Sequence, residues 1–176
     1  MYNLQELVLE DSDYLIKYLT LEDAAILQAL YNQCVDFALL TYGCPFSQNA
    51  AREEFIDVPE GKTKDDNYLF GLYDSYNRLI GAIASHKHYP NCQTWWIGLM
   101  MLTPASRNRG LGKKFYRAFE CWVAKQNIAQ ISLCTVQENK IGLKFWQKMG
   151  FKIVRTISTK QFQSKNHKVY VLNKKI

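Results

Sequence analysis

The segment whose residue types most clearly suit ligand binding runs from Arg107 to Lys113. It follows an apolar stretch that ends at Pro104. It has the spacing Arg-x-x-Gly-x-Gly, with glycines at positions 110 and 112. Glycine lets the backbone approach a ligand closely, and the first N–H groups of a helix have no internal acceptor. Because the helix dipole also favours negative charge at that end, this loop predicts a cradle for phosphate groups.

Two common nucleotide-binding patterns are excluded by the same residues. A dinucleotide-binding fingerprint needs a third glycine at position 115, where this chain has Phe115. A P-loop needs four residues between its first glycine and Gly-Lys-Ser/Thr, whereas one residue separates Gly110 from Gly112. A glycine-containing turn before a basic surface helix stays open as the alternative interpretation.

A second informative segment runs from Asn139 to Phe151 and follows one expected strand later. Its sequence is Asn-Lys-Ile-Gly-Leu-Lys-Phe-Trp-Gln-Lys-Met-Gly-Phe. Together the two segments resemble the GNAT superfamily of N-acetyltransferases. The usual pattern of that family is a strand, Pro, Gln/Arg-x-x-Gly-x-Gly/Ala, a helix, a strand, and Asn-x-x-Ala-x-x-Leu/Phe-Tyr-x-x-x-Gly-Phe. The resemblance covers residues 95–151 closely and the flanking strands more loosely.

The resemblance implies one α/β (α+β) domain over residues 1–176, with the GNAT-like acyl-CoA N-acyltransferase fold. That fold is a mixed, mostly antiparallel sheet of about seven strands flanked by helices. A helical region at about 20–60 would border the acceptor side, and a core at about 94–151 would bind acyl-CoA. The strands before and after the helix at 111–126 should be parallel neighbours joined by a right-handed crossover, and they should splay where the thioester enters.

Hydrophobic patterning predicts the individual elements. The expected helices span residues 23–40, 50–58, 111–126 and 139–149. The expected strands are a short one around Leu15 and Ile16, then 68–73, 78–86, 94–102, 131–136, 151–158 and 168–172, with a polar turn at 161–166. The strand at 94–102 is apolar on both faces, which predicts a central place in the sheet.

The resemblance also implies acetyl-CoA or another acyl-CoA as co-substrate, with an amine that attacks the thioester directly. It puts Met100, Met101 and Leu102 along the pantetheine arm, with the backbone N–H of Leu102 polarising the thioester carbonyl. Asn139 falls on a position that hydrogen-bonds the pantetheine region, and a helix N-cap is its alternative role. The residues that would bind the pyrophosphate are Arg107, Asn108, Arg109, Gly110, Leu111, Gly112 and Lys113.

The chain departs from the family pattern at the positions that carry protons. Trp146 stands where many members have a tyrosine that protonates the leaving thiolate, and an indole N–H is no practical acid. A thiol pKa near ~8.5 still makes the thiolate a fair leaving group. Trp146 is counted among the residues beside the cofactor, with core packing as its alternative role. The strand at 94–102 has no glutamate, and Cys134 stands where some relatives carry a glutamate base.

His86 and His88 are therefore candidates for the general base, because an imidazole pKa near ~6.5 suits deprotonation of an amine. Their spacing of two residues puts them on one face of a regular strand. Tyr89, Asp36 and Glu53 are further candidates, and a water molecule is another.

Charge is distributed unevenly along the chain. Residues 1–90 carry 14 acidic and 6 basic side chains, for a net −8, whereas residues 91–176 carry 2 acidic and 16 basic, for +14. The acidic half predicts attraction of a cationic amine, either a small polyamine-like or aminoglycoside-like molecule or a protein amino group, with a solvated acidic surface as the alternative. The basic half leaves a nucleic-acid-binding domain as a less favoured class. The departures from the family pattern leave a catalytically silent acyl-CoA-binding module as a third class.

The remaining sequence features concern location and assembly. The N-terminus lacks the basic and apolar regions of a leader, and no apolar run is long enough to cross a bilayer, so we expect a cytoplasmic protein without a membrane partner. We expect no metal and, by analogy with the fold, a homodimer. Five cysteines without a CxxC pair predict reduced and mostly buried thiols: Cys34, Cys44, Cys92, Cys121 and Cys134.

Overall fold

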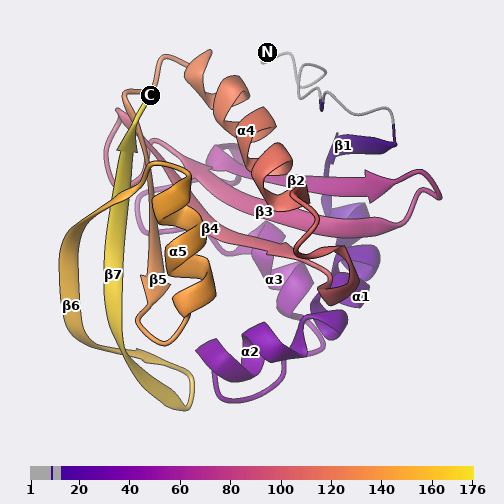
Figure 1. Ribbon diagram of the computed structural model, residues 1–176, viewed down its shortest axis with the longest axis horizontal. Helices are drawn as coiled ribbons and strands as arrows, with labels where there is room; N and C mark the ends of the chain where they lie inside the picture. The colour runs from indigo at the N-terminus through magenta and orange to yellow at the C-terminus, as the bar shows by residue number, and fades with distance from the viewer. Residues whose placement is uncertain (1–8, 10–12) are drawn as a thin grey trace.

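The computed structural model describes Leu9 and residues 13–176, which fold around a seven-stranded sheet (Figure 1). The strand order is β1-β2-β3-β4-β5-β7-β6. The strands are β1 (Tyr14–Tyr18), β2 (Asn67–Asp74), β3 (Leu79–Lys87), β4 (Thr94–Leu102), β5 (Gln130–Val136), β6 (Lys152–Phe162) and β7 (Lys165–Lys175). The N-terminal stretch that bears on the question of a leader lies, apart from Leu9, outside the described residues.

The helices cover both faces of this sheet. They are α1 (Ala24–Gln33), α2 (Val35–Thr41), α3 (Ala50–Ile56), α4 (Leu111–Ala124) and α5 (Lys140–Lys148). Helices α4 and α5 pack on one face, whereas α1 and α3 pack on the other (Figure 1). The pairing is antiparallel except between β4 and β5. The expected mixed, mostly antiparallel sheet flanked by helices is confirmed.

The central strand β4 separates from β5 partway along its length. Their parallel register covers Thr94–Ile97 of β4 and Gln130–Leu133 of β5, although β4 runs on to Leu102. Gly98 forms a bulge at this point, because Ile97 pairs with Ser85 of β3 whereas Leu99 pairs with the preceding residue, Ala84. The two strands diverge beyond the bulge (Figure 1). The predicted parallel neighbours and their splay are both confirmed.

Helix α4 owes its position to an aromatic layer that the sequence pattern anticipates. Its buried stripe includes Phe115, Phe119 and Trp122. The Trp122 ring lies 5.1 Å from that of Trp95 on β4 and 5.0 Å from that of Phe70 on β2, measured between centroids. Burial of such large rings contributes much of the core free energy. It fixes the N-terminus of α4 beside the end of β4.

Two expected elements differ from the structure. The helix at 23–40 is wrong as one element, because Cys34 (ψ 36°) separates α1 from α2. The polar turn at 161–166 is also wrong, because β6 and β7 pair up to Phe162 and Lys165, and Gln163 (φ 48°) makes a tight turn. Polar side chains there belong to exposed strands, whose backbone pairing does not depend on a buried face.

The expectation of mostly buried cysteines is wrong, although all five thiols are free. Cys34 alone is buried; Cys44 and Cys134 are partly exposed, and Cys92 and Cys121 are exposed. Cys121 lies on the outer side of α4, opposite the apolar stripe.

The part of the chain that the structure describes contains no helix with the length and apolar character needed to cross a bilayer. Within the same residues, no three side chains of His, Cys, Asp or Glu gather as metal ligands would.

A buried carboxylate ties α4 to the C-terminal strand. Glu120 accepts hydrogen bonds from the Tyr116 hydroxyl at 2.9 Å and from Arg117 at 2.5 Å, and it pairs with Lys174 of β7. Burial alone would raise the pKa of Glu120, but the hydrogen bonds from Lys174, Tyr116 and Arg117 outweigh it and lower that pKa. The charge on Glu120 therefore stabilises the fold.

We expect Glu120→Gln to lower the free energy of unfolding by about 1–3 kcal/mol at neutral pH, because a charged hydrogen-bond acceptor is lost. A carboxyl group whose pKa is lower in the folded state stabilises the fold fully at pH values above its ordinary pKa of about 4.3. This stabilisation is lost as the pH falls through the pKa of the folded state. Urea unfolding from pH 7 downward should therefore show the difference from the parent protein narrowing below about pH 4. The exposed Glu60→Gln should match the parent at every pH. A constant difference would contradict the role of the charge.

Candidate active site

The loop before α4 has the geometry of an anion cradle. Gly110 is the N-cap of α4 and has φ +78°, a left-handed conformation that glycine adopts readily. The first helical N–H bond is made by Lys114, to the carbonyl oxygen of Gly110 at 3.2 Å. The N–H groups of the preceding turn therefore have no helical acceptor. A Cβ on Gly110 would meet no atom within 4 Å, so the backbone at this position is open to an approaching group.

Gly112 has a different role in the same turn. A Cβ there would lie 3.5 Å from the Phe145 ring of α5 and 3.7 Å from Leu102 at the end of β4. The first turn of α4 thus approaches both neighbours closely. The cradle and the gap between β4 and β5 are consequently next to each other.

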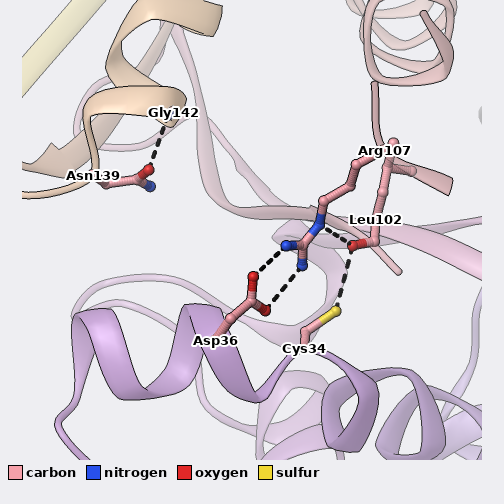
Figure 2. Close-up of polar contacts among 6 residues, drawn as sticks. All are labelled: Cys34, Asp36, Leu102, Arg107, Asn139 and Gly142. Carbon is pink, nitrogen blue, oxygen red and sulfur yellow. Dashed lines mark hydrogen bonds and ion pairs between the residues drawn. The ribbon is translucent and has the colours of Figure 1, made fainter. Parts of the chain in front are cut away.

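The carbonyl group of Leu102 is held by side chains from two directions (Figure 2). Arg107 Nε donates a hydrogen bond to this oxygen at 2.9 Å, and the Cys34 thiol donates to it at 3.5 Å. The Arg107 guanidinium also forms a bidentate ion pair with Asp36 of α2, with a distance of 3.1 Å from Nη2 to Oδ1. The side chain of Arg107 therefore joins the cradle loop to α2, and its charge is directed at Asp36.

Titration behaviour separates the candidate bases. The hydrogen bond from Arg107 lowers the pKa of Asp36, which makes this carboxylate a weak base. Burial raises the pKa of the Cys134 thiol, which disfavours its thiolate form. Burial lowers the pKa of His86 from the ordinary 6.5, so this imidazole is neutral at pH 7.

His86 lies beside the bulge on β4. Its Nε2 atom is 3.7 Å from the point that a Cβ on Gly98 would occupy. Its Nδ1 atom is buried and finds no hydrogen-bond partner among the described residues. The missing side chain of Gly98 therefore leaves the His86 ring next to the place where β4 and β5 separate.

His88 does not share a strand face with His86, so that expectation is wrong. Strand β3 ends at Lys87, and His88 has a left-handed φ of 57°. The regular alternation of side chains stops where the strand stops. Tyr89 follows in the same loop and packs edge-on against Trp96, with centroids 5.7 Å apart.

Asn139 and Trp146 both make structural contacts that position α5. The Asn139 side chain caps α5, because its Oδ1 accepts a hydrogen bond from the Gly142 N–H at 2.9 Å (Figure 2). The Trp146 ring is buried against its aromatic neighbours. Centroid distances are 5.4 Å to Tyr116, 4.9 Å to Phe145 and 5.2 Å to Phe151. Both residues thus fix the position of α5 beside the cradle.

Sequence reasoning missed two features of the site. An isolated glycine inside an apolar strand is a known sign of a bulge, so Gly98 carried a usable signal. A cavity of about 220 Å³ lies on the side of the sheet covered by α1 and α3. Its lining comes from α1, α3, the segment between α2 and α3, and the β6–β7 turn, a combination that no local pattern predicts: Tyr31, Tyr42, Phe46, Ser47, Ala50, Glu53, Glu54, Asp57 and Gln163.

Known structures share this architecture. An acetyltransferase from Thermus thermophilus matches with a TM-score of 0.72 at 16% identity, covering 93% of this chain and 97% of that one. Spermidine N-acetyltransferase from Vibrio cholerae gives 0.72 at 15% identity, with 94% and 96% covered. Ribosomal-protein-S5-alanine acetyltransferase from Vibrio fischeri gives 0.73 at 14% identity, with 94% of each chain covered. At these identities the matches show the fold.

The family of this chain is established by its sequence. The model of the acetyltransferase (GNAT) domain matches residues 16–170, so this chain belongs to that family. A curated relative, the uncharacterised protein YxbD of Bacillus subtilis (strain 168), is 27% identical over 86 residues. The match spans about half of each protein, 49% of this chain and 51% of the relative. Family membership indicates acetyltransferase chemistry.

Gly110 offers a test of the cradle with a closely matched control. Gly110 and Gly61 have φ of +78° and +76°, and a Cβ on either would meet nothing within 4 Å. Leucine should therefore cost similar backbone strain, about 1 kcal/mol, at both positions. We expect Gly110→Leu to weaken CoA binding at least ~10-fold in calorimetric titration, because the side chain fills the phosphate space. Gly61→Leu should bind CoA normally. Equal affinity of both variants would contradict the cradle.

The Arg107–Asp36 pair generates a separate prediction. Asp36 is largely exposed, so Asp36→Asn should cost less than ~1 kcal/mol of stability. It should lower kcat/KM for acyl-CoA by about 3- to 10-fold, because the Leu102 carbonyl and α2 lose their common anchor. Asp74→Asn, which breaks the Asp74–Arg78 pair in the β2–β3 turn, should leave kcat/KM unchanged. Steady-state kinetics and thermal unfolding of both variants test this prediction. An equal loss of kcat/KM in Asp74→Asn would refute a positioning role for the Arg107–Asp36 pair.

Proposed function

We propose that this protein transfers the acetyl group of acetyl-CoA to an amine. The proposal depends on one observation above all: the opening between β4 and β5 lies directly beside the N-terminus of α4, whose first N–H groups have no helical acceptor. The diphosphate would bind the backbone N–H groups of Asn108–Lys113, with charge from Arg109 and Lys113. Among the described residues, no strand lies beside the edge of β4 from Gly98 to Leu102 on the β5 side, so an extended pantetheine arm can pair there.

The reaction is a direct displacement at the thioester. The amine nitrogen attacks the carbonyl carbon, the C–S bond breaks, and CoA leaves as a thiolate. A backbone N–H of β4 polarises the carbonyl, with Leu102 as the candidate from the sequence. Met100 and Met101 border the arm. Because a thiol pKa is near ~8.5, the thiolate can leave without a tyrosine in place of Trp146.

His86 is our candidate for the group that accepts the proton of the attacking amine. It is neutral at pH 7, and its Nε2 faces the bulge at which the strands separate. The nitrogen loses its proton to Nε2 as the new C–N bond forms. Two of the other candidates are less suitable, since Asp36 is paired with Arg107 and His88 lies outside the strand.

The acceptor is an amine in this proposal, in line with the acidic N-terminal half of the chain. The proposal is tested by measuring the free thiol released from acetyl-CoA in the presence of each member of a panel of small amines and peptide N-termini. Release that requires an amine supports the transfer. Tight CoA binding without thiol release over the whole panel would instead indicate a silent acyl-CoA-binding module.

The two histidines form a matched pair for testing the base. We expect His86→Gln to lower kcat by about 10²-fold, the usual range for loss of a general base. In the parent protein kcat/KM should rise with pH through a pKa below 6.5, because the neutral imidazole is the active form. That inflection should disappear in His86→Gln and persist in His88→Gln. Full activity in His86→Gln would rule out this assignment.

A further inference from the structure

The cavity beside α3 combines two kinds of wall that together suit a cation. Aromatic rings come from Tyr31 of α1 and from Tyr42 and Phe46 in the segment after α2. Carboxylates come from Glu53 and Glu54 of α3 and from Asp57 just beyond it. At about 220 Å³, the cavity holds an aminoalkyl arm rather than a drug-sized molecule, for which pockets start at about 300 Å³.

The aromatic wall is held in place by its own contacts. The ring centroids of Tyr31 and Phe46 are 4.6 Å apart, and those of Tyr42 and Phe46 are 5.7 Å apart. Phe37 stacks behind Phe46 at 6.3 Å. The faces of such rings attract an ammonium group, and the attraction grows when water is excluded.

The cavity carboxylates form no ion pair with a basic side chain in the part of the chain that the structure describes. The Tyr31 hydroxyl donates a hydrogen bond to Glu54 Oε2 at 2.9 Å. Burial, and then the charge of Asp57, raises the pKa of Glu54. A cation in the cavity would offset the cost of holding these groups together.

The cavity lies close to the opening between β4 and β5. The segment that lines the cavity lies against β7, the strand that pairs with β5. The Ser164 hydroxyl donates a hydrogen bond to the Tyr42 carbonyl oxygen at 2.7 Å, and His167 Nε2 lies 2.9 Å from the Thr41 carbonyl oxygen. On the other side, Tyr31 is one helical turn from Cys34, whose thiol reaches the Leu102 carbonyl. The cavity wall at Tyr31 and the contact to the end of β4 at Cys34 are therefore about one helical turn apart, roughly 5 Å along the helix axis.

We propose that this cavity binds a second, non-reacting ammonium group of the acceptor, which makes the acceptor a small aliphatic diamine or polyamine. This inference rests on the proposed acetyl transfer. An amine held among carboxylates and aromatic faces stays protonated, so it has no lone pair for attack on a thioester. The nucleophile must be another amine of the same molecule, placed at the splay.

Matched acceptors test this arrangement directly. With acetyl-CoA, kcat/KM should be at least ~10-fold higher for 1,4-diaminobutane or 1,6-diaminohexane than for n-butylamine, which lacks the second cation. Asp57→Asn, Glu54→Gln and Phe46→Leu should each reduce this preference. Glu60→Gln, which removes an exposed carboxylate outside the cavity, should keep it. Asp57 is exposed, so its variant should fold even if the Glu54 variant does not.

The outcomes separate the cavity from the reaction. Equal kcat/KM for the diamines and n-butylamine would overturn the inference while leaving acetyl transfer intact, and so would a preference for lysine-containing peptides over diamines. If no amine is acetylated, calorimetric titration with 1,4-diaminobutane still decides. Binding that Asp57→Asn abolishes supports the cavity and removes the proposed reaction, whereas no binding overturns the cavity as well.

Discussion

The whole site depends on the loss of pairing between two parallel strands. β4 and β5 share a register over Thr94–Ile97 and then part at Gly98, where an extra residue bends β4. The aromatic layer under α4 and the Glu120–Lys174 pair hold the surrounding elements firmly enough that the gap does not close. An unpaired strand edge inside a protein is normally unfavourable, because its N–H and C=O groups lack partners. Here the same groups can hydrogen-bond an extended ligand.

The two faces of the sheet carry different parts of the proposed site. The face under α4 and α5 carries the cradle and the larger apolar core, including the buried Trp146. The face under α1 and α3 carries His86, Cys34 and the acidic cavity. Gly98 lies at the point where β4 and β5 separate, and its missing side chain leaves room beside the His86 ring. The opposite charges of the two halves of the chain are consistent with the anionic carrier and the cationic acceptor that we propose.

Local sequence information was sufficient wherever one element and its immediate neighbour decide the structure. The bounds of β4 agree with the prediction to the residue, and α4 follows from an apolar stripe after paired glycines. The break at Cys34 has no glycine or proline to mark it and instead lets α2 face Arg107. The left-handed turn at His88 likewise reflects where β3 stops pairing. Contacts between residues 126 positions apart, such as the hydrogen bond that the Lys165 ammonium donates to the backbone carbonyl of Leu39, leave no periodic pattern in the sequence.

The ion pair between Arg107 and Asp36 has a thermodynamic consequence. Arg107 belongs to the loop that would bind the diphosphate, and Asp36 belongs to α2, whose C-cap residue Tyr42 lines the cavity proposed for the acceptor. A ligand that shifts either element changes the energy of the other through this contact. Linkage requires that any such effect be mutual, so the affinity for the carrier and the affinity for the acceptor change by the same factor. Binding of either substrate would then raise or lower the affinity for the other, and the effect would be equal in both directions.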